Sequence, residues 1–183
     1  VTRVMALNYL VDSHGKSAVP AVRNAMSNAS DKLVAYGMWL LERTEGLEDQ
    51  MLGKLARGIQ RLPRVFAMKI LAERPELTPF QQQLVVAALE DADPTTRRAA
   101  ADALTRHPLP RSIQSLFSAW RQAEEGDTHL IHVLRMALRF QLESIDDWDQ
   151  LGRAIPEADK DRLTAMAAVI GSEAASFYAA KQI

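Results

Sequence analysis

Residues 78–107 constrain the fold of this chain more than any other stretch, because two helical segments there are separated by an Asp-Pro step. Thr78 can accept a hydrogen bond from an amide of the first helical turn, and Pro79 suits the first helical position, where its missing N–H would be unpaired anyway. Asp93 ends the first segment, since a residue before proline is disfavoured in the α region, and Pro94 opens the second. The stretch therefore predicts two antiparallel helices joined by a tight turn.

The same pattern occurs one unit earlier in the chain. Five positions of residues 64–75 have equivalents 33 positions later (97 minus 64), and both stretches end in proline. The equivalent residues are Arg64, Ala67, Leu71, Arg74 and Pro75 in the first stretch, and Arg97, Ala100, Leu104, His107 and Pro108 in the second. A helix pair that recurs with a period of about 20–50 residues is typical of an α-solenoid.

Helical periodicity extends over the rest of the chain, and no alternating run is long enough to predict a pair of strands. The expected helices cover residues 1–12, 17–28, 32–44, 47–58, 63–74, 110–123, 127–142 and 156–170, with shorter helices after residue 144 and over 173–181. Residues 32–44 are apolar nearly all round, which predicts a helix buried between others. The sequence therefore predicts an all-α chain in which Leu71, Leu84, Leu104 and Leu138 are buried between repeats.

Length and charge limit the possible organisation. A chain of 183 residues suits a single domain, 1–183, or one segment of a solenoid. Hydrophobic residues make up 48% of it, and no apolar run reaches the roughly 18 residues that a membrane span needs. The net charge of −1 argues against a surface that binds nucleic acid throughout, because phosphate binding needs clustered lysine and arginine. Since the chain begins at Val1, we expect it to be a segment of a longer protein.

Reactive motifs are missing from the sequence. Cysteine is absent, which excludes disulfides, thiolate catalysis and covalent c-type haem attachment within this chain. There is no glycine-rich phosphate loop and no Gly-x-Ser-x-Gly motif. We therefore expect a non-enzymatic chain without a cofactor, and the composition leaves the cellular compartment undetermined.

Residues 89–104, Leu-Glu-Asp-Ala-Asp-Pro-Thr-Thr-Arg-Arg-Ala-Ala-Ala-Asp-Ala-Leu, resemble the core of a HEAT repeat. In that family a helix ends in aspartate, an Asp-Pro turn follows, and the next helix carries an early arginine before its alanine and leucine packing positions. The resemblance covers about residues 31–142 and implies an α-α superhelix of helix pairs, in which Asp91 and Arg97 link neighbouring units. Gly58 stands where Asp91 stands one unit later, so the aspartate does not recur in the preceding unit.

A second resemblance concerns residues 107–142, which include the run Asp-Thr-His-Leu-Ile-His-Val-Leu-Arg-Met-Ala-Leu-Arg from position 127. This region is similar to the HEAT-containing middle region of large multidomain bacterial proteins. Those proteins combine such a region with a propeller-like dehydrogenase domain and a haem-binding cytochrome c domain. The resemblance implies that other domains flank this chain in a longer protein.

Basic side chains recur on the second helices of two successive units. In an α-solenoid these helices line the concave face, so the side chains could form a basic stripe for an acidic segment, a phosphate or nucleic acid. The concave-face candidates are Arg98 and Arg106 in the first of these helices and His132, Arg135 and Arg139 in the second. The alternative is that arginines of these helices, with Arg97, pair with acids and link the repeats; the available acids are Asp91, Asp93, Asp102 and Glu143.

Asp127, His129 and His132 form a weak candidate for a metal site. Histidines three positions apart on a helix can point to one side, and two imidazoles with a carboxylate are ligands for a divalent metal. The simpler interpretation is that Asp127 or Thr128 caps the helix and that the histidines pack between helices.

Trp148 is the tryptophan that we expect to be exposed, because it lies among Asp146, Asp147 and Asp149. An exposed tryptophan could anchor a protein partner, and the alternative is packing in the core or under a lid. The three acids do not match the spacing of a calcium loop, and clustered acids also favour a helix N-terminus.

These observations predict a non-enzymatic repeat scaffold that mediates protein–protein interaction or spaces neighbouring domains. The main alternative is a HEAT-like nucleic-acid-binding protein or DNA glycosylase with a basic concave groove, which the near-neutral charge disfavours. A lyase or chaperone for a pigment is a third possibility that some HEAT-like proteins suggest.

Overall fold

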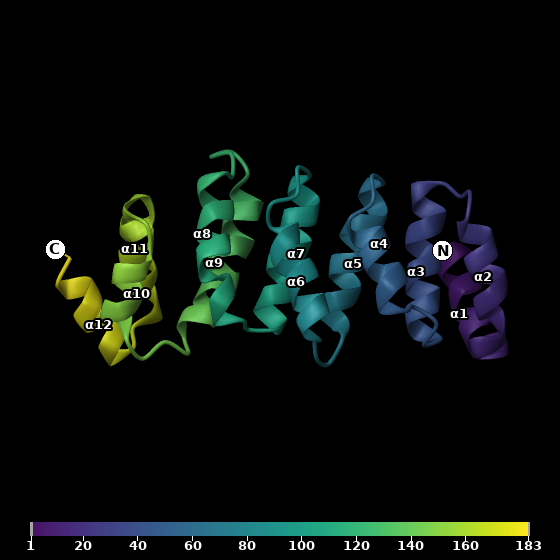
Figure 1. The fold of residues 1–183 in the computed structure, drawn as a ribbon, viewed down its shortest axis with the longest axis horizontal. Helices are drawn as coiled ribbons and strands as arrows, with labels where there is room; N and C mark the ends of the chain where they lie inside the picture. The colour runs from purple at the N-terminus through teal and green to yellow at the C-terminus, as the bar shows by residue number, and fades with distance from the viewer. Residues whose placement is uncertain (1, 183) are drawn as a thin grey trace. The chain divides into compact units, whose positions relative to one another are not determined.

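The computed structural model describes residues 2–182, and their regular secondary structure is entirely helical (Figure 1). The α-helices are α1 (Thr2–His14), α2 (Val19–Met26), α3 (Asp31–Arg43), α4 (Asp49–Ala56), α5 (Arg61–Glu73), α6 (Pro79–Ala88), α7 (Pro94–Arg106), α8 (Ile113–Arg121), α9 (Thr128–Leu142), α10 (Trp148–Ala154), α11 (Lys160–Ile170) and α12 (Glu173–Ala180). Short 3₁₀ turns cover Gly15–Ala18, Pro110–Ser112 and Glu157–Asp159. No strand occurs among residues 2–182, which confirms the prediction of an all-α chain.

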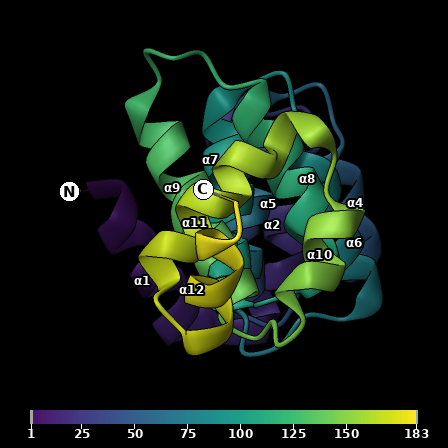
Figure 2. The ribbon, with the colours of Figure 1, turned by 90° about the vertical axis from the view of Figure 1, so that its left-hand side faces the viewer.

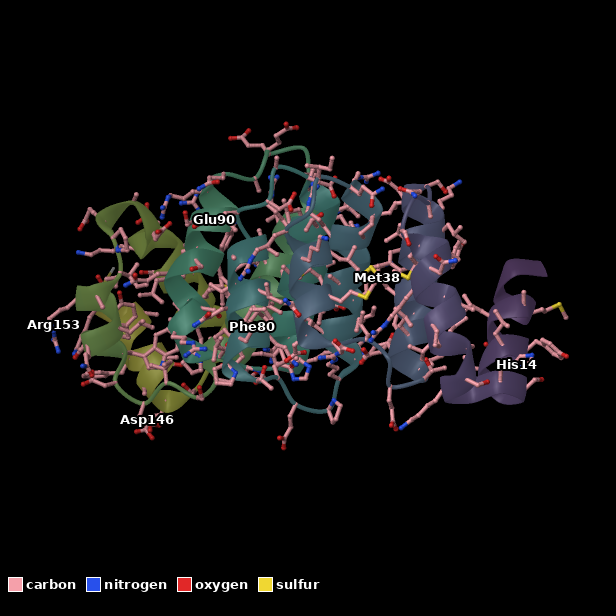
Figure 3. All side chains as sticks on the ribbon, turned by 45° about the vertical axis from the view of Figure 1, so that its right-hand side comes forward. His14, Met38, Phe80, Glu90, Asp146 and Arg153 are labelled. Carbon is pink, nitrogen blue, oxygen red and sulfur yellow. The ribbon has the colours of Figure 1, made fainter. Side chains whose placement is uncertain are left out.

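The chain divides into two compact units, Val1–Ala88 and Leu89–Ile183. In the first unit α3 packs against α5, while α4 packs against both α5 and α6, and α1 and α2 contact α3. Met38 of α3 lies within the ribbon of this unit (Figure 3) and is completely buried. Leu71 and Leu84 are buried as predicted. Leu33 is 49% exposed, so α3 is not buried on every side as its sequence suggested.

In the second unit α9 is the helix with the most neighbours. It packs against α7, α8 and α11, and α12 packs against α10 and α11 (Figure 2). Leu104 of α7 and Leu138 of α9 are buried as predicted, together with Phe117 of α8. The 3₁₀ turn before α11 is a small correction to the helix expected from residue 156.

Reciprocal hydrogen bonds cap the start of α6. The main-chain N–H of Gln81 donates to Oγ1 of Thr78 over 3.3 Å, which confirms the expected cap. Oε1 of Gln81 accepts the main-chain N–H of Thr78 over 3.1 Å, so the two residues form a capping box. The amide of Gln81 also donates to Asp49 of α4 over 2.8 Å, which ties the start of α6 to the start of α4.

An arginine makes the same contact at two places, once in each compact unit. Nη1 of Arg97 donates to the main-chain carbonyl of Asp91 over 2.9 Å, and Nη1 of Arg64 donates to the carbonyl of Gly58 over 3.1 Å. Donor and acceptor are 33 positions apart between the two contacts (97 minus 64; 91 minus 58). Because the acceptor is a backbone atom, the contact does not depend on the side chain at position 58 or 91.

A polar side chain near the C-terminal end of a helix makes an equivalent connection in each unit. In the first unit Arg74, after α5, donates to Glu42 at the end of α3 over 2.7 Å and to Asp49 over 3.1 Å. The hydrogen bond to Glu42 is the main reason that the pKa of Arg74 is raised. In the second unit the buried Gln141 donates to the carbonyl of Leu104 over 2.8 Å and accepts the N–H of Leu109. Each residue joins the end of its helix to the end of the helix two places earlier, and to the start of the segment that follows that earlier helix.

Candidate functional site

Arg98 of α7 and His129 of α9 contact each other at the surface of the second unit. Nη1 of Arg98 lies 2.9 Å from Nδ1 of His129, so the imidazole nitrogen accepts when it carries no proton. His132 lies one turn further along α9 and is exposed.

Arg135 continues this row and lies over a tryptophan. Its guanidinium carbon is 5.8 Å from the ring centroid of Trp120, and that of Arg162 is 5.6 Å from the same centroid. Trp120 is half-buried and stacks on Phe117, with centroids 6.4 Å apart. Arg162 also lies 3.6 Å from Asp159, whereas Arg135 forms no ion pair with any residue in the described part of the chain. The guanidinium of Arg135 is therefore available to an anion.

Arg106 and Arg139 differ from the other candidates because each lies near an acid on its own helix or just after it. Nε of Arg106 is 4.0 Å from Asp102, and Nε of Arg139 is 3.0 Å from Glu143. In each pair the carboxylate offsets the charge of the arginine. Because both pairs are exposed, they contribute little to the stability of the fold. Of the expected stripe, Arg98, His132 and Arg135 remain without an acidic neighbour. Together with His129, which contacts Arg98, we call them the basic row.

The weak metal candidate is not supported by the geometry. Oδ1 of Asp127 accepts the N–H of Leu130 over 3.0 Å and caps α9, as expected of an N-cap aspartate. His129 contacts the cationic Arg98, a position that repels a second cation. Within the described residues, no three histidine or acidic side chains are arranged to hold a metal ion. The suggestion of a site formed by Asp127, His129 and His132 is therefore wrong.

Trp148 is buried, so the expectation of an exposed anchor is also wrong. Only 2% of this residue is exposed, because it packs against Tyr178 of α12 with ring centroids 5.9 Å apart. Gly152, one turn later on α10, makes this packing possible, since a Cβ there would lie 2.7 Å from the Tyr178 ring. Asp147 caps α10 by accepting the N–H of Gln150 over 2.7 Å. The exposed aromatic residue of this region is instead Phe177, at 65%.

A small cavity of about 300 Å³ lies between the start of α10 and α12. Its lining consists of Asp146, Asp147, Trp148, Asp149, Ala174, Phe177 and Tyr178. Nζ of Lys181, just after α12, lies 2.7 Å from Asp149 and 4.6 Å from the centroid of Phe177. Burial raises the pKa of Tyr178, and the nearby Asp149 adds to this effect while Lys160 opposes it. The cavity thus combines carboxylates with aromatic faces.

Asp159 is a buried carboxylate that the sequence did not single out. Its side chain is about 1% exposed and forms an ion pair with Arg121 at the end of α8. Arg162, one turn later on α11, lies 3.6 Å from it, and both arginines are about one-third exposed. Asp159 therefore joins the turn before α11 to the end of α8. The sequence offered only a cluster of acids near a helix start, which does not distinguish a buried pair from an exposed cap.

The first unit contains an apolar groove of about 500 Å³ between α1, α2 and α3. Leu7, Leu10, Met26 and Tyr36 are among its lining residues. Met26 reaches over Gly37, where a Cβ would lie 2.5 Å from its sulfur. The lining is mostly apolar, and Lys32 is its one charged residue, so the groove offers contact area but little that would define a ligand.

Comparisons with protein-family models, with curated proteins and with solved structures each found no match. In the described part of the chain, no helix combines the length and the apolar character needed to cross a membrane.

Proposed function

We propose that this chain is a non-enzymatic binding scaffold, an α-α superhelix of HEAT-like helix pairs that presents the basic row to an acidic segment of a protein partner. The observation that carries the repeat assignment is the pair of contacts from Arg64 to Gly58 and from Arg97 to Asp91, which recur with a spacing of 33 residues. Stacked helix pairs give extended surfaces suited to binding.

Binding depends on the arginines of α7 and α9 that have no acidic side chain beside them. Arg106 and Arg139 have acidic neighbours, whereas Arg98 faces a histidine and Arg135 faces Trp120. A guanidinium on an aromatic face stays in position with its N–H groups free, and its fork geometry matches a carboxylate. An acidic segment is preferred to nucleic acid because a net charge of −1 provides no long basic surface for phosphates.

Binding of a fluorescein-labelled peptide of glutamates, measured by anisotropy at low salt, tests this function. Arg135→Gln should weaken binding about fivefold, the effect of losing a charge-assisted hydrogen bond at an exposed site. Arg106→Gln is the matched control, because Asp102 already offsets that charge. Added salt should weaken binding by the wild-type protein.

Two outcomes would overturn the assignment. Equal loss of binding in both variants would indicate a diffuse charge effect rather than the basic row. Tighter binding of a DNA duplex than of the peptide, with loss on Arg135→Gln, would support the nucleic-acid alternative.

A further inference from the structure

The cavity between α10 and α12 is built from two kinds of group that bind organic cations. Asp146, Asp147 and Asp149 supply negative charge, and Phe177 and Tyr178 supply aromatic rings. The Asp146 side chain extends from the loop before α10 (Figure 3) and forms no ion pair with a described residue. Carboxylates combined with aromatic faces are the chemistry by which proteins recognise ammonium groups.

The protein's own Lys181 shows that both elements lie within reach of one ammonium. Its Nζ is 2.7 Å from Oδ2 of Asp149 and 4.6 Å from the Phe177 centroid, well within the usual range of about 6 Å for such contacts. The Lys181 side chain is 43% exposed, and its ion pair is that of a surface pair, which costs little to break. An incoming ammonium can therefore take its place.

Trp148 forms a buried part of the cavity wall. Its indole Nε1 is buried and donates no hydrogen bond to any described residue, although the residue is only 2% exposed. Buried donors normally have partners. Because this nitrogen has almost no exposed surface, the groups that a ligand can reach are the exposed carboxylates and the Phe177 ring.

We propose that this cavity binds the ammonium group of a lysine side chain in a partner's peptide segment, in competition with Lys181. A volume of about 300 Å³ is at the small end of ligand pockets and suits one side chain rather than a larger molecule. Metal ions are poor candidates, because no three acidic or histidine side chains in the described part of the chain are arranged to hold one. The proposal does not depend on the basic row, which attracts the opposite charge.

The test is a titration of the full chain with lysine model compounds, followed by amide chemical shifts in NMR spectra. The probes are N-acetyl-lysine methylamide, its trimethylammonium derivative and the uncharged norleucine analogue. Both cations should shift the amides of residues 146–149 and 174–181, and the norleucine analogue should not. The relative affinity of the two cations identifies whether the carboxylates or the aromatic faces dominate, and either order agrees with the proposal.

Substitutions make the test specific. Asp149→Asn and Phe177→Leu should each weaken binding of the lysine probe about fivefold, the effect of one exposed cation contact. Both side chains are largely exposed, so neither change should unfold the protein. Lys181→Met should strengthen binding severalfold, because it removes the internal competitor. Lys54→Met, which changes an exposed lysine in the other unit, is the control and should have no effect.

The opposite results would contradict the proposal. If Lys181→Met leaves the affinity unchanged, the internal ammonium does not occupy the ligand's position. If norleucine shifts the same amides as strongly as lysine, the cavity binds apolar groups and charge is irrelevant. Absence of shifts at residues 146–149 and 174–181 with either cation would exclude the site.

Discussion

Arg64 and Arg97 make the same main-chain contact at positions 33 residues apart. Each arginine folds back onto a main-chain carbonyl six positions earlier, which satisfies an acceptor at the turn before its helix. The carbonyl exists whatever the side chain, so the glycine at position 58 does not interrupt the pattern. The resemblance to HEAT repeats implied this role for the pair of Asp91 and Arg97. Arg97 donates to the main-chain carbonyl of Asp91, and the Asp91 carboxylate accepts the N–H of Asp93 over 2.8 Å.

Replacing either arginine should therefore destabilise the protein by a similar amount. We expect Arg97→Ala and Arg64→Ala each to lower the free energy of unfolding by about 1–3 kcal/mol, the usual effect of losing a hydrogen bond from a charged group to a partly buried acceptor. Urea denaturation followed by circular dichroism measures this change. Arg153→Ala is the control, because Arg153 points into solvent (Figure 3) and its loss should change stability by less than about 0.5 kcal/mol. A loss for Arg97 alone would contradict the equivalence.

Tyr178 gives a prediction about alkaline pH. Its pKa is raised in the folded protein, chiefly because the phenol is buried. The unfolded chain then loses this proton first, near pH 10, so the contribution of Tyr178 is complete below that pH and decreases as pH rises further. The urea midpoint of the wild type should fall more steeply between pH 9 and about pH 11 than that of Tyr178→Phe. Parallel curves for the two proteins would show that the Tyr178 phenol does not contribute to the loss of stability at alkaline pH.

At the scale of helices, Asp159 connects the end of α8 to the start of α11. A buried carboxylate between two arginines stabilises the folded state only while the charges remain paired. Removing one partner from a fully buried pair lowers the free energy of unfolding by about 3–5 kcal/mol. Arg121 and Arg162 are about one-third exposed and can be hydrated, which reduces the effect.

We expect Asp159→Asn to lower the free energy of unfolding by about 2 kcal/mol, below the range for fully buried pairs. Asp102→Asn is the matched control, because it removes an exposed carboxylate 4.0 Å from Arg106 and should change stability by less than about 1 kcal/mol. The two variants are compared by urea denaturation at one pH. Equal effects would show that burial of Asp159 does not matter for its pairing.

At the scale of the whole molecule, each compact unit has a buried core of its own. Leu71 lies in the core of residues 1–88, and Leu138 lies in the core of residues 89–183. Proteins open locally in contiguous cooperative units, so a defect in one core should act mainly nearby.

Hydrogen exchange followed by mass spectrometry tests this locality. Leu71→Ala should accelerate amide exchange mainly in α3 to α6, and Leu138→Ala mainly in α7 to α11, because each substitution creates a cavity that costs about 2–5 kcal/mol in its own core. Each variant serves as the control for the other. A uniform acceleration over both units in either variant would indicate that the chain opens as one cooperative block.

The sequence alone determined the helical class, the positions of most helices and the turn between the central pair α6 and α7. These features depend on local physics: proline placement, capping residues and apolar spacing act within a few residues of the chain. Burial of Leu71, Leu84, Leu104 and Leu138 followed from the same spacing. The capping box is visible in the sequence as the pattern Thr78-x-x-Gln81. The helix-start signals predict the bond to the Thr78 hydroxyl, and the return bond to Gln81 follows from the same pattern.

Tertiary structure decided what the polar and aromatic side chains do. Trp148 lies among acids in the sequence, yet Tyr178, about 30 residues later (178 minus 148), packs onto it across Gly152. Likewise, only the folded chain distinguishes Arg135, which lies over Trp120, from Arg139, which pairs with Glu143. These outcomes depend on which side chains meet across helices, and a contact between distant segments leaves no periodic signal in either one.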